Sequence, residues 1–158
     1  MMNMEELVQS NLQENNTLDL EKHDIGDEGV RQLAQMDLLK DITRLELGDN
    51  GITDIGVKAL VDSPLIANLK SLNLKSNKIT ADGIQALAES PNLMGLDQLI
   101  LKFNDIGEAG AQHLANSQTL KSLTTLDLFR SRIGKNGTSA IKRSPFYKNL
   151  SRVRLSEV

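Results

Sequence analysis

The sequence predicts an α/β solenoid built from 27-residue repeats, each contributing one short strand and one helix. A Leu-x-Leu motif recurs at this step without insertion, beginning at Leu18, Leu45, Leu72, Leu99 and Leu126, with Val153 opening a sixth copy. Other columns keep the same step. The 158 residues include no Cys, no Trp and only 3% aromatics, so the core must be aliphatic.

Each repeat should open with the strand, because leucines two residues apart point to the same side of an extended chain. The second leucine keeps the phase at Leu20, Leu47, Leu74, Leu101, Leu128 and Leu155. A polar column follows, where the chain leaves the sheet: His23, Asn50, Asn77, Asn104 and Ser131. An Asn amide both donates and accepts, so a ladder of Asn50, Asn77 and Asn104 can satisfy backbone groups that have lost their sheet partners.

The second half of each repeat should be helical. Thr53 and Thr80 suit the N-cap, and Gly26, Gly107 and Gly134 occupy the same phase. A glycine column at Gly29, Gly56, Gly83, Gly110 and Gly137 predicts close approach of each helix to its neighbouring layer. The Ser-Pro pairs that begin at Ser63, Ser90 and Ser144 should end the helices, because the residue before proline disfavours helical geometry.

The pattern Leu72-x-Leu74-x-x-Asn77-x-Ile79-x-x-x-Gly83-x-x-x-Leu87-Ala88 resembles a leucine-rich repeat, and its length is similar to that of the ribonuclease-inhibitor-like subtype. The resemblance implies a right-handed horseshoe arc, with a parallel sheet on the concave face and helices on the convex face. The regular Ser-Pro spacing is also similar to that of bacterial effectors that act on host proteins. We expect a capping helix within residues 1–15 and a repeat domain over 16–158, with five repeats and a final strand.

The ends of the chain carry further expectations. The N-terminus shows no signal-peptide pattern, so we expect a cytoplasmic protein, or one secreted without a cleaved signal peptide. The last strand leaves an open edge that invites weak self-association, although Arg152 and Arg154 can blunt it. The terminal Ser156-Glu157-Val158 also fits a PDZ ligand, although so short a motif is common by chance.

The strand residues that flank the leucines should face the concave side, where a partner can bind. Ile100, Phe103 and Phe129 interrupt a polar surface on adjacent strands and could form one apolar patch. Single exposed apolar residues are the plainer interpretation. The expected partner-binding residues are Arg44, Glu46, Lys75, Ile100, Lys102, Phe103, Phe129, Arg130, Arg152 and Arg154.

Charge is unevenly distributed along the chain. Residues 1–69 contain five basic and fourteen acidic residues, a net charge of −9, whereas residues 70–158 contain thirteen and seven, a net charge of +6. The whole-chain charge of −3 therefore averages two opposite halves. Such a dipole could steer a charge-complementary partner, or it could simply solvate the surface.

These observations favour a non-enzymatic protein-interaction module that needs no cofactor or metal. The sequence has no nucleophile–base pair and no phosphate loop, and neither His23 nor His113 has a ligand set around it. The family resemblance implies one alternative, an activator of a small GTPase. Nucleic-acid binding through the basic half is a further alternative, but the acidic half argues against it. No apolar run approaches the ~18 residues of a membrane helix, so we expect no membrane association.

Overall fold

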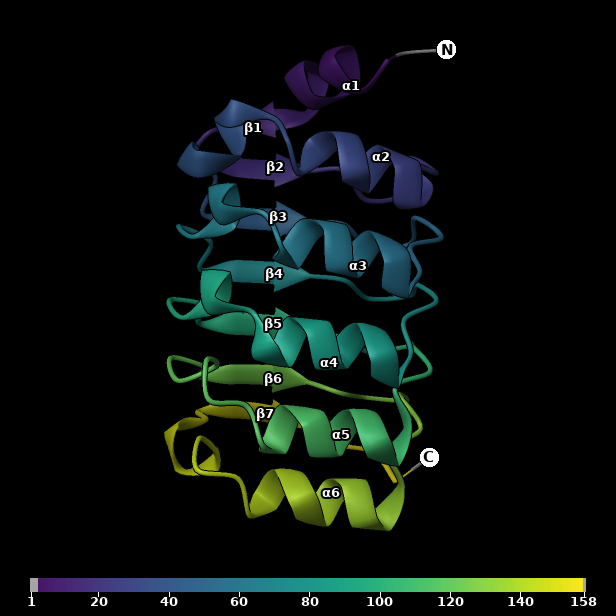
Figure 1. The fold of residues 1–158 in the computed structure, drawn as a ribbon, viewed down its shortest axis with the longest axis vertical. Coiled ribbons are helices and arrows are strands. Elements are labelled where there is room, and N and C mark those ends of the chain that lie inside the picture. Colours follow the sequence, from purple (N-terminus) through teal and green to yellow (C-terminus); the bar gives the residue numbers. More distant parts are fainter. Residues whose placement is uncertain (1–2, 158) are drawn as a thin grey trace.

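The computed structural model describes residues 3–157, in which strands and helices alternate along the long axis of the molecule (Figure 1). Within this range one sheet contains strands in sequence order: β1 (Leu12–Gln13), β2 (Thr17–Asp19), β3 (Arg44–Glu46), β4 (Ser71–Asn73), β5 (Gln98–Ile100), β6 (Thr125–Asp127) and β7 (Arg152–Arg154). The α-helices are α1 (Met4–Asn11), α2 (Gly26–Leu33), α3 (Asp54–Val61), α4 (Ala81–Glu89), α5 (Gly107–Ala115) and α6 (Gly134–Lys142).

The sheet register follows the sequence repeat. Strands β2 to β7 are parallel, and each pairing joins residues 27 apart, as in Leu45 with Leu72. Both leucines of each motif from Leu18 to Leu128 are fully buried. The helices form a second layer on one side of the sheet, each packed against the next (Figure 1). The predicted α/β leucine-rich-repeat solenoid is confirmed.

The helices start in two different ways, which depend on the preceding repeat. The Asp27 carboxylate accepts the N–H of Thr53 at 2.8 Å, the Thr53 hydroxyl at 2.6 Å and the N–H of Gly56 at 3.0 Å. Asp54 accepts the N–H and hydroxyl of Thr80 in the same way. These carboxylates therefore satisfy the start of the next helix, a role the sequence did not suggest.

Where the preceding repeat lacks such an Asp, the helix begins instead at a glycine with positive φ: Gly26, Gly107 or Gly134. The N-cap prediction needs a correction at one position. Thr53 accepts the N–H of Ile55 at 3.3 Å, whereas the Thr80 side chain forms no cap hydrogen bond.

The glycine column has a steric reason. A Cβ on Gly56 would lie 2.4 Å from Oδ1 of Asp27, and one on Gly83 would lie 2.4 Å from Oδ1 of Asp54. Gly56 and Gly83 therefore leave room for a carboxylate of the preceding repeat. That carboxylate bonds the start of the helix that contains the glycine.

The segments between helix and strand also connect successive repeats. They contain the 3₁₀-helices η1 (Asp37–Asp41), η2 (Pro64–Ile66), η3 (Pro91–Leu93) and η4 (Tyr147–Asn149). The serine before each of two prolines bonds backward: Ser63 Oγ donates to the carbonyl of Ala34 and Ser90 Oγ to that of Val61, both at 2.6 Å. These serines therefore help to satisfy carbonyls at the end of the preceding helix, where intrahelical partners are lacking; the Val61 carbonyl also accepts from the Asn92 amide at 2.9 Å.

The two ends of the sheet differ. At the N-terminal end, α1 is followed by β1, which pairs antiparallel with β2 and covers that edge. At the C-terminal end, β7 pairs with β6 on one side, and Leu150, Val153 and Leu155 are only partly buried although their column mates are fully buried or nearly so. Phe146 is buried in the last repeat, with Tyr147 packed partly against the core.

Candidate partner-binding surface on the open sheet face

The sheet face opposite the helices, here called the open sheet face, is the predicted concave face. The alternation of a strand places the leucines toward the helices and their neighbours on this face. The columns of polar side chains that result differ between the two halves of the molecule.

The Asn ladder supports this face from within the turns. Asn50 is 1% exposed; its amide donates to the carbonyls of Leu20, Leu47 and Gly48, and its oxygen accepts the N–H of His23. Asn77 and Asn104 repeat this arrangement, each bonding the preceding repeat. The ladder fixes the point at which each strand leaves the sheet. It therefore also fixes the positions of the residues that follow the second leucine of each motif. At the last turn Ser131 replaces the amide and donates to the Leu101 carbonyl at 3.0 Å.

In the N-terminal half, an ion pair crosses a whole repeat. Lys75 Nζ lies 2.9 Å from Glu21 Oε1, although one side chain follows β4 and the other follows β2. Gly48 occupies the same column between them, and a Cβ there would lie 2.9 Å from Cγ of Lys75. The absence of a side chain at Gly48 therefore lets the lysine reach its partner.

This ion pair should make stability depend on pH. The hydrogen bond that the Lys75 ammonium donates to the Glu21 carboxylate lowers the pKa of Glu21 and raises the pKa of Lys75. A lowered carboxylate pKa stabilises the fold above the ordinary value of 4.5, and this stabilisation is lost as pH falls through the folded-state pKa. Lys75→Met should therefore lower the free energy of unfolding by about 0.5–1 kcal/mol at pH 7 and by much less at pH 3.

Urea denaturation of both proteins at the two pH values measures this difference. Lys58→Met is the control, because Lys58 pairs with Asp62 on an exposed helix surface, with both side chains at least 60% exposed. An equal cost of Lys75→Met at pH 3 and pH 7 would contradict the role of the pair.

A second group of polar side chains is also satisfied internally. Arg44 Nε lies 2.7 Å from Glu46, and the amide of Asn73 donates to the same carboxylate at 2.8 Å. Glu46 is buried to 9% exposure. Together with the Glu21–Lys75 pair, these groups line a hollow of about 380 Å³ whose charges already have partners.

The C-terminal half carries an aromatic pair. The ring centroids of Phe103 and Phe129 lie 5.8 Å apart with the planes at 82°, an edge-to-face arrangement. Phe129 is held by Asp127, whose carboxylate accepts the Phe129 N–H at 3.0 Å. Phe103 remains 44% exposed and has a φ of 60°, a left-handed conformation that Lys22, Asp49, Ser76 and Arg130 share at the same phase of the repeat. The left-handed conformation is uncommon for a bulky residue, which makes Phe an unfavourable choice at this position.

Three cations surround this pair. The Arg154 guanidinium lies 4.4 Å from the centroid of Phe129, that of Arg130 lies 5.5 Å from the same ring, and Lys102 Nζ lies 6.0 Å from the centroid of Phe103. Arg154 also lies 3.4 Å from Asp127. The structure thus combines apolar area with positive charge on β5, β6 and β7 and the turns that follow them.

The expected partner-binding residues therefore fall into two groups. Phe103 and Phe129 meet, with Lys102, Arg130 and Arg154 around them. Ile100 lies partly buried at the end of β5, and Arg152 is exposed at the start of β7. Arg44, Glu46 and Lys75 are instead engaged with other protein side chains. Sequence reasoning missed Glu21, Asn73 and Asp127 as partners. The column Glu21, Gly48, Lys75 was visible in the sequence and could have suggested the long ion pair.

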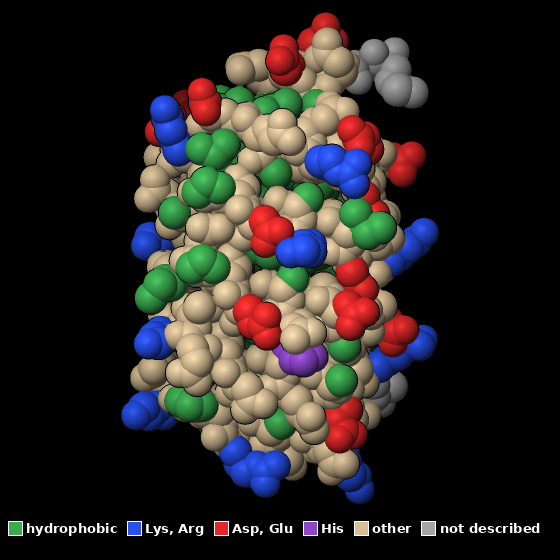
Figure 2. Space-filling model, in the orientation of Figure 1, with side chains coloured by type: hydrophobic (Ala, Val, Ile, Leu, Met, Phe, Trp, Pro, Cys, Tyr) green, Lys and Arg blue, Asp and Glu red, His purple; other side chains and the backbone are tan. Residues whose placement is uncertain are grey.

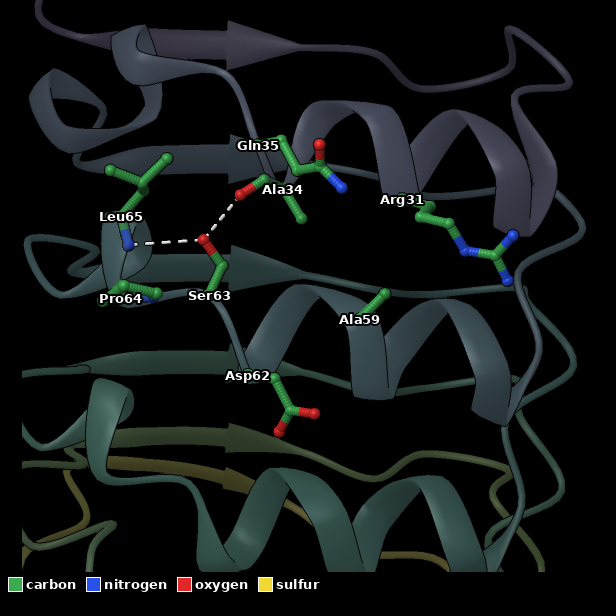
Figure 3. A pocket seen from close by; sticks show the side chains of 8 residues that line it. All are labelled: Arg31, Ala34, Gln35, Ala59, Asp62, Ser63, Pro64 and Leu65. Carbon is green, nitrogen blue, oxygen red and sulfur yellow. Dashed lines mark hydrogen bonds between the residues drawn. The ribbon is translucent and has the colours of Figure 1, made fainter.

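The helix side offers only shallow, mixed surfaces. Figure 2 shows acidic, basic and hydrophobic side chains interspersed over it, with Lys and Arg at its lower tip. A hollow of about 390 Å³ lies between α2 and α3, where Ser63 bonds the backbone of Ala34 and Leu65 (Figure 3).

Residues 3–157 contain no cluster of His, Asp or Glu suited to a metal ion. The carboxyl-terminal Val158 of the suggested PDZ ligand lies outside the described residues.

The fold and this surface define a class of protein: an open α/β repeat solenoid with a polar sheet face and an aromatic cluster near one end. The model for the family described as "Leucine Rich repeat" matches residues 16–34, 40–61, 66–88 and 119–142. The chain belongs to the leucine-rich repeat family. Among curated proteins no match is found. The ribonuclease-inhibitor-like subtype stays a prediction.

A solved structure shows the same fold. The actin-binding site 2 of leiomodin-1 is similar with a TM-score of 0.58 and 21% identity, covering 89% of this chain and 86% of that one. An internalin from Listeria monocytogenes is 19% identical, with a TM-score of 0.44, and covers 76% of this chain and 36% of that one. No helix in the described part of the chain has the length and hydrophobicity to span a bilayer.

Proposed function

We propose that the protein is a non-enzymatic interaction module that binds a protein partner on the C-terminal half of its open sheet face. The observation that carries this proposal is the Phe103–Phe129 pair. Phe103 combines an unfavourable backbone conformation with a half-exposed ring, so fold stability does not account for its presence.

The geometry also suits the energetics of protein interfaces. Most binding energy at an interface comes from a few anchors, among which aromatic residues and Arg are enriched. Here two rings pack edge to face and the Arg130 guanidinium lies 5.5 Å from the centroid of Phe129, so these anchors are already together before a partner binds. The leucine-rich repeat fold supports the proposal, because solenoids present extended surfaces that bind other proteins.

The test separates binding from stability. Phe103→Asn should leave the melting temperature unchanged or raise it slightly, because Asn tolerates the left-handed conformation better than Phe. The same substitution should weaken binding to a partner isolated by affinity pull-down about 30-fold, the effect of losing a ~2 kcal/mol anchor. Isothermal titration calorimetry with the purified partner measures the dissociation constants of the unsubstituted protein and of Phe103→Asn. Thermal unfolding of both proteins measures their stability.

Ile55→Asn is the matched control, because Ile55 is 61% exposed but lies on α3 in the helix layer. It should leave the dissociation constant unchanged. Unchanged binding by Phe103→Asn together with Phe129→Ala would refute the proposed surface. The captured partner could also prove to be a small GTPase. If the protein then accelerated GTP hydrolysis by that partner, the same surface would have a regulatory function.

A further inference from the structure

We infer that the partner segment on this surface is an acidic polypeptide, with an apolar side chain packed against Phe103 and Phe129 and carboxylates bound by the surrounding cations. This inference rests on the proposed function and names the chemistry of the partner. It follows from how differently the two halves of the open sheet face use their charges.

In the N-terminal half, two cations of this face are already paired with carboxylates. Lys75 is paired with Glu21 at 2.9 Å, and Arg44 with Glu46 at 2.7 Å. These cations are therefore poorly available to a partner, because a new anion would have to displace a carboxylate already in place.

In the C-terminal half the cations are in excess. Lys102, Arg130 and Arg152 form no ion pair with any residue between 3 and 157. Arg154 shares the Asp127 carboxylate at a long 3.4 Å and its side chain is 54% exposed. The remaining acid near this end, Glu157, likewise forms no ion pair within the described residues. This half of the face thus lacks the anions that a charge-complementary partner would supply.

A groove beside the aromatic pair extends this surface. It encloses about 490 Å³ and is lined by Phe103, Lys78, Arg130 and Arg132, with Asp105 as its one acidic residue. Asp105 lies 3.7 Å from Arg132, and both side chains are more than 60% exposed, so the pair is weak. An extended segment could place an apolar side chain against Phe103 while its carboxylates reach Arg130 on one side and Lys102 on the other.

The rings are poorly arranged for nucleic acid. Bases bind such surfaces by stacking on a free aromatic face. Phe129 instead has Arg154 4.4 Å from its centroid and Phe103 packed at a right angle. A guanidinium beside a ring still has N–H groups free to bind a carboxylate. Residues 1–69, which carry a net charge of −9, would also repel a long polyanion.

Fluorescence anisotropy with labelled peptides tests the inference directly. The probe is Gly-Asp-Glu-Phe-Asp-Glu-Gly, compared with its amide version Gly-Asn-Gln-Phe-Asn-Gln-Gly and with a version carrying Ala in place of Phe. We expect the acidic probe to bind about tenfold or more tightly than either, with an affinity that falls as salt is raised. An oligothymidylate of equal charge should bind more weakly than the acidic probe.

Charge-matched variants locate the site. Replacing Lys102, Arg130 and Arg152 together by Gln should weaken binding of the acidic probe about tenfold or more. The control replaces Lys135, Lys142 and Lys148 by Gln, which removes the same charge from exposed positions on α6 and η4. It should change the affinity less than about twofold.

Several results would overturn the inference: no binding of the acidic probe at millimolar concentration, equal binding of the amide version, equal losses in the two triple variants, or tighter binding of the oligonucleotide. If these occur while Phe103→Asn still abolishes capture of the partner, the acidic chemistry is wrong and the interaction surface stands. If Phe103→Asn and Phe129→Ala leave the captured partner bound, the surface itself is wrong.

Discussion

Replacing Asn50 by Ala is expected to lower the free energy of unfolding by about 3 kcal/mol, because several buried backbone groups lose their partner at once. The Asn50 amide donates to three carbonyls and accepts the N–H groups of His23 and Ile25. The side chain is 1% exposed, so water cannot easily replace it. For a chain of this size the melting temperature should fall by roughly 6–12 °C.

Thermal and urea unfolding, monitored by circular dichroism, measure this effect. Asn149→Ala is the control, since Asn149 is exposed and its side chain forms no hydrogen bond within residues 3–157. Ser131→Ala should cost about 1 kcal/mol, because Ser131 supplies one good bond where Asn50 supplies several. If Asn50→Ala cost no more than Asn149→Ala, the ladder would not be the device that holds successive turns together.

Replacing Gly56 by Ala is expected to destabilise the fold by about 2–3 kcal/mol, although Ala normally favours a helix over Gly by about 1 kcal/mol. The new Cβ would lie 2.4 Å from Oδ1 of Asp27 and 3.3 Å from its Cα. Asp27 cannot move away freely, because its carboxylate also holds Thr53 at the start of α3. The steric conflict therefore outweighs the gain in helix propensity.

A double-mutant cycle with Asp27→Ala isolates this contact. Asp27→Ala alone should cost about 2 kcal/mol through its lost hydrogen bonds, but the two substitutions together should cost clearly less than their sum. Gly95→Ala is the control, because a Cβ there would meet only the mobile Nζ of Lys70, at 3.0 Å. Strict additivity of Gly56→Ala and Asp27→Ala would show that the carboxylate and the glycine are not coupled.

The same pair of residues shows where sequence reasoning stopped short. The 27-residue period made it clear that Gly56 lies against a neighbouring layer, because a column without a Cβ indicates close approach. It did not indicate that the neighbour is the carboxylate of Asp27, since Asp at a helix start is equally well explained by the dipole of its own helix. Only the stacking of repeats shows whether such a carboxylate stabilises the start of its own helix or accepts hydrogen bonds at the start of the next one.

The candidate site shows a similar division. The phase of the repeat was enough to place Phe103 and Phe129 on neighbouring strand ends of one face. It could not show that the rings meet edge to face, or that Lys75 reaches across Gly48 to Glu21. The reach of a long side chain depends on the space left by the residues between, which a pattern read along the chain does not contain.

The period, the register and the identity of the core follow from the sequence alone, because a repeat that keeps its apolar columns for five copies has one way to bury its leucines. Which charges are satisfied depends on how the repeats stack in the folded protein. In the N-terminal half of the open sheet face, Lys75 has a carboxylate partner two repeats away and Arg44 has one on its own strand, whereas Lys102, Arg130 and Arg152 have none within residues 3–157. Charge pairing depends on distances across strands, and these distances arise only when the repeats are stacked.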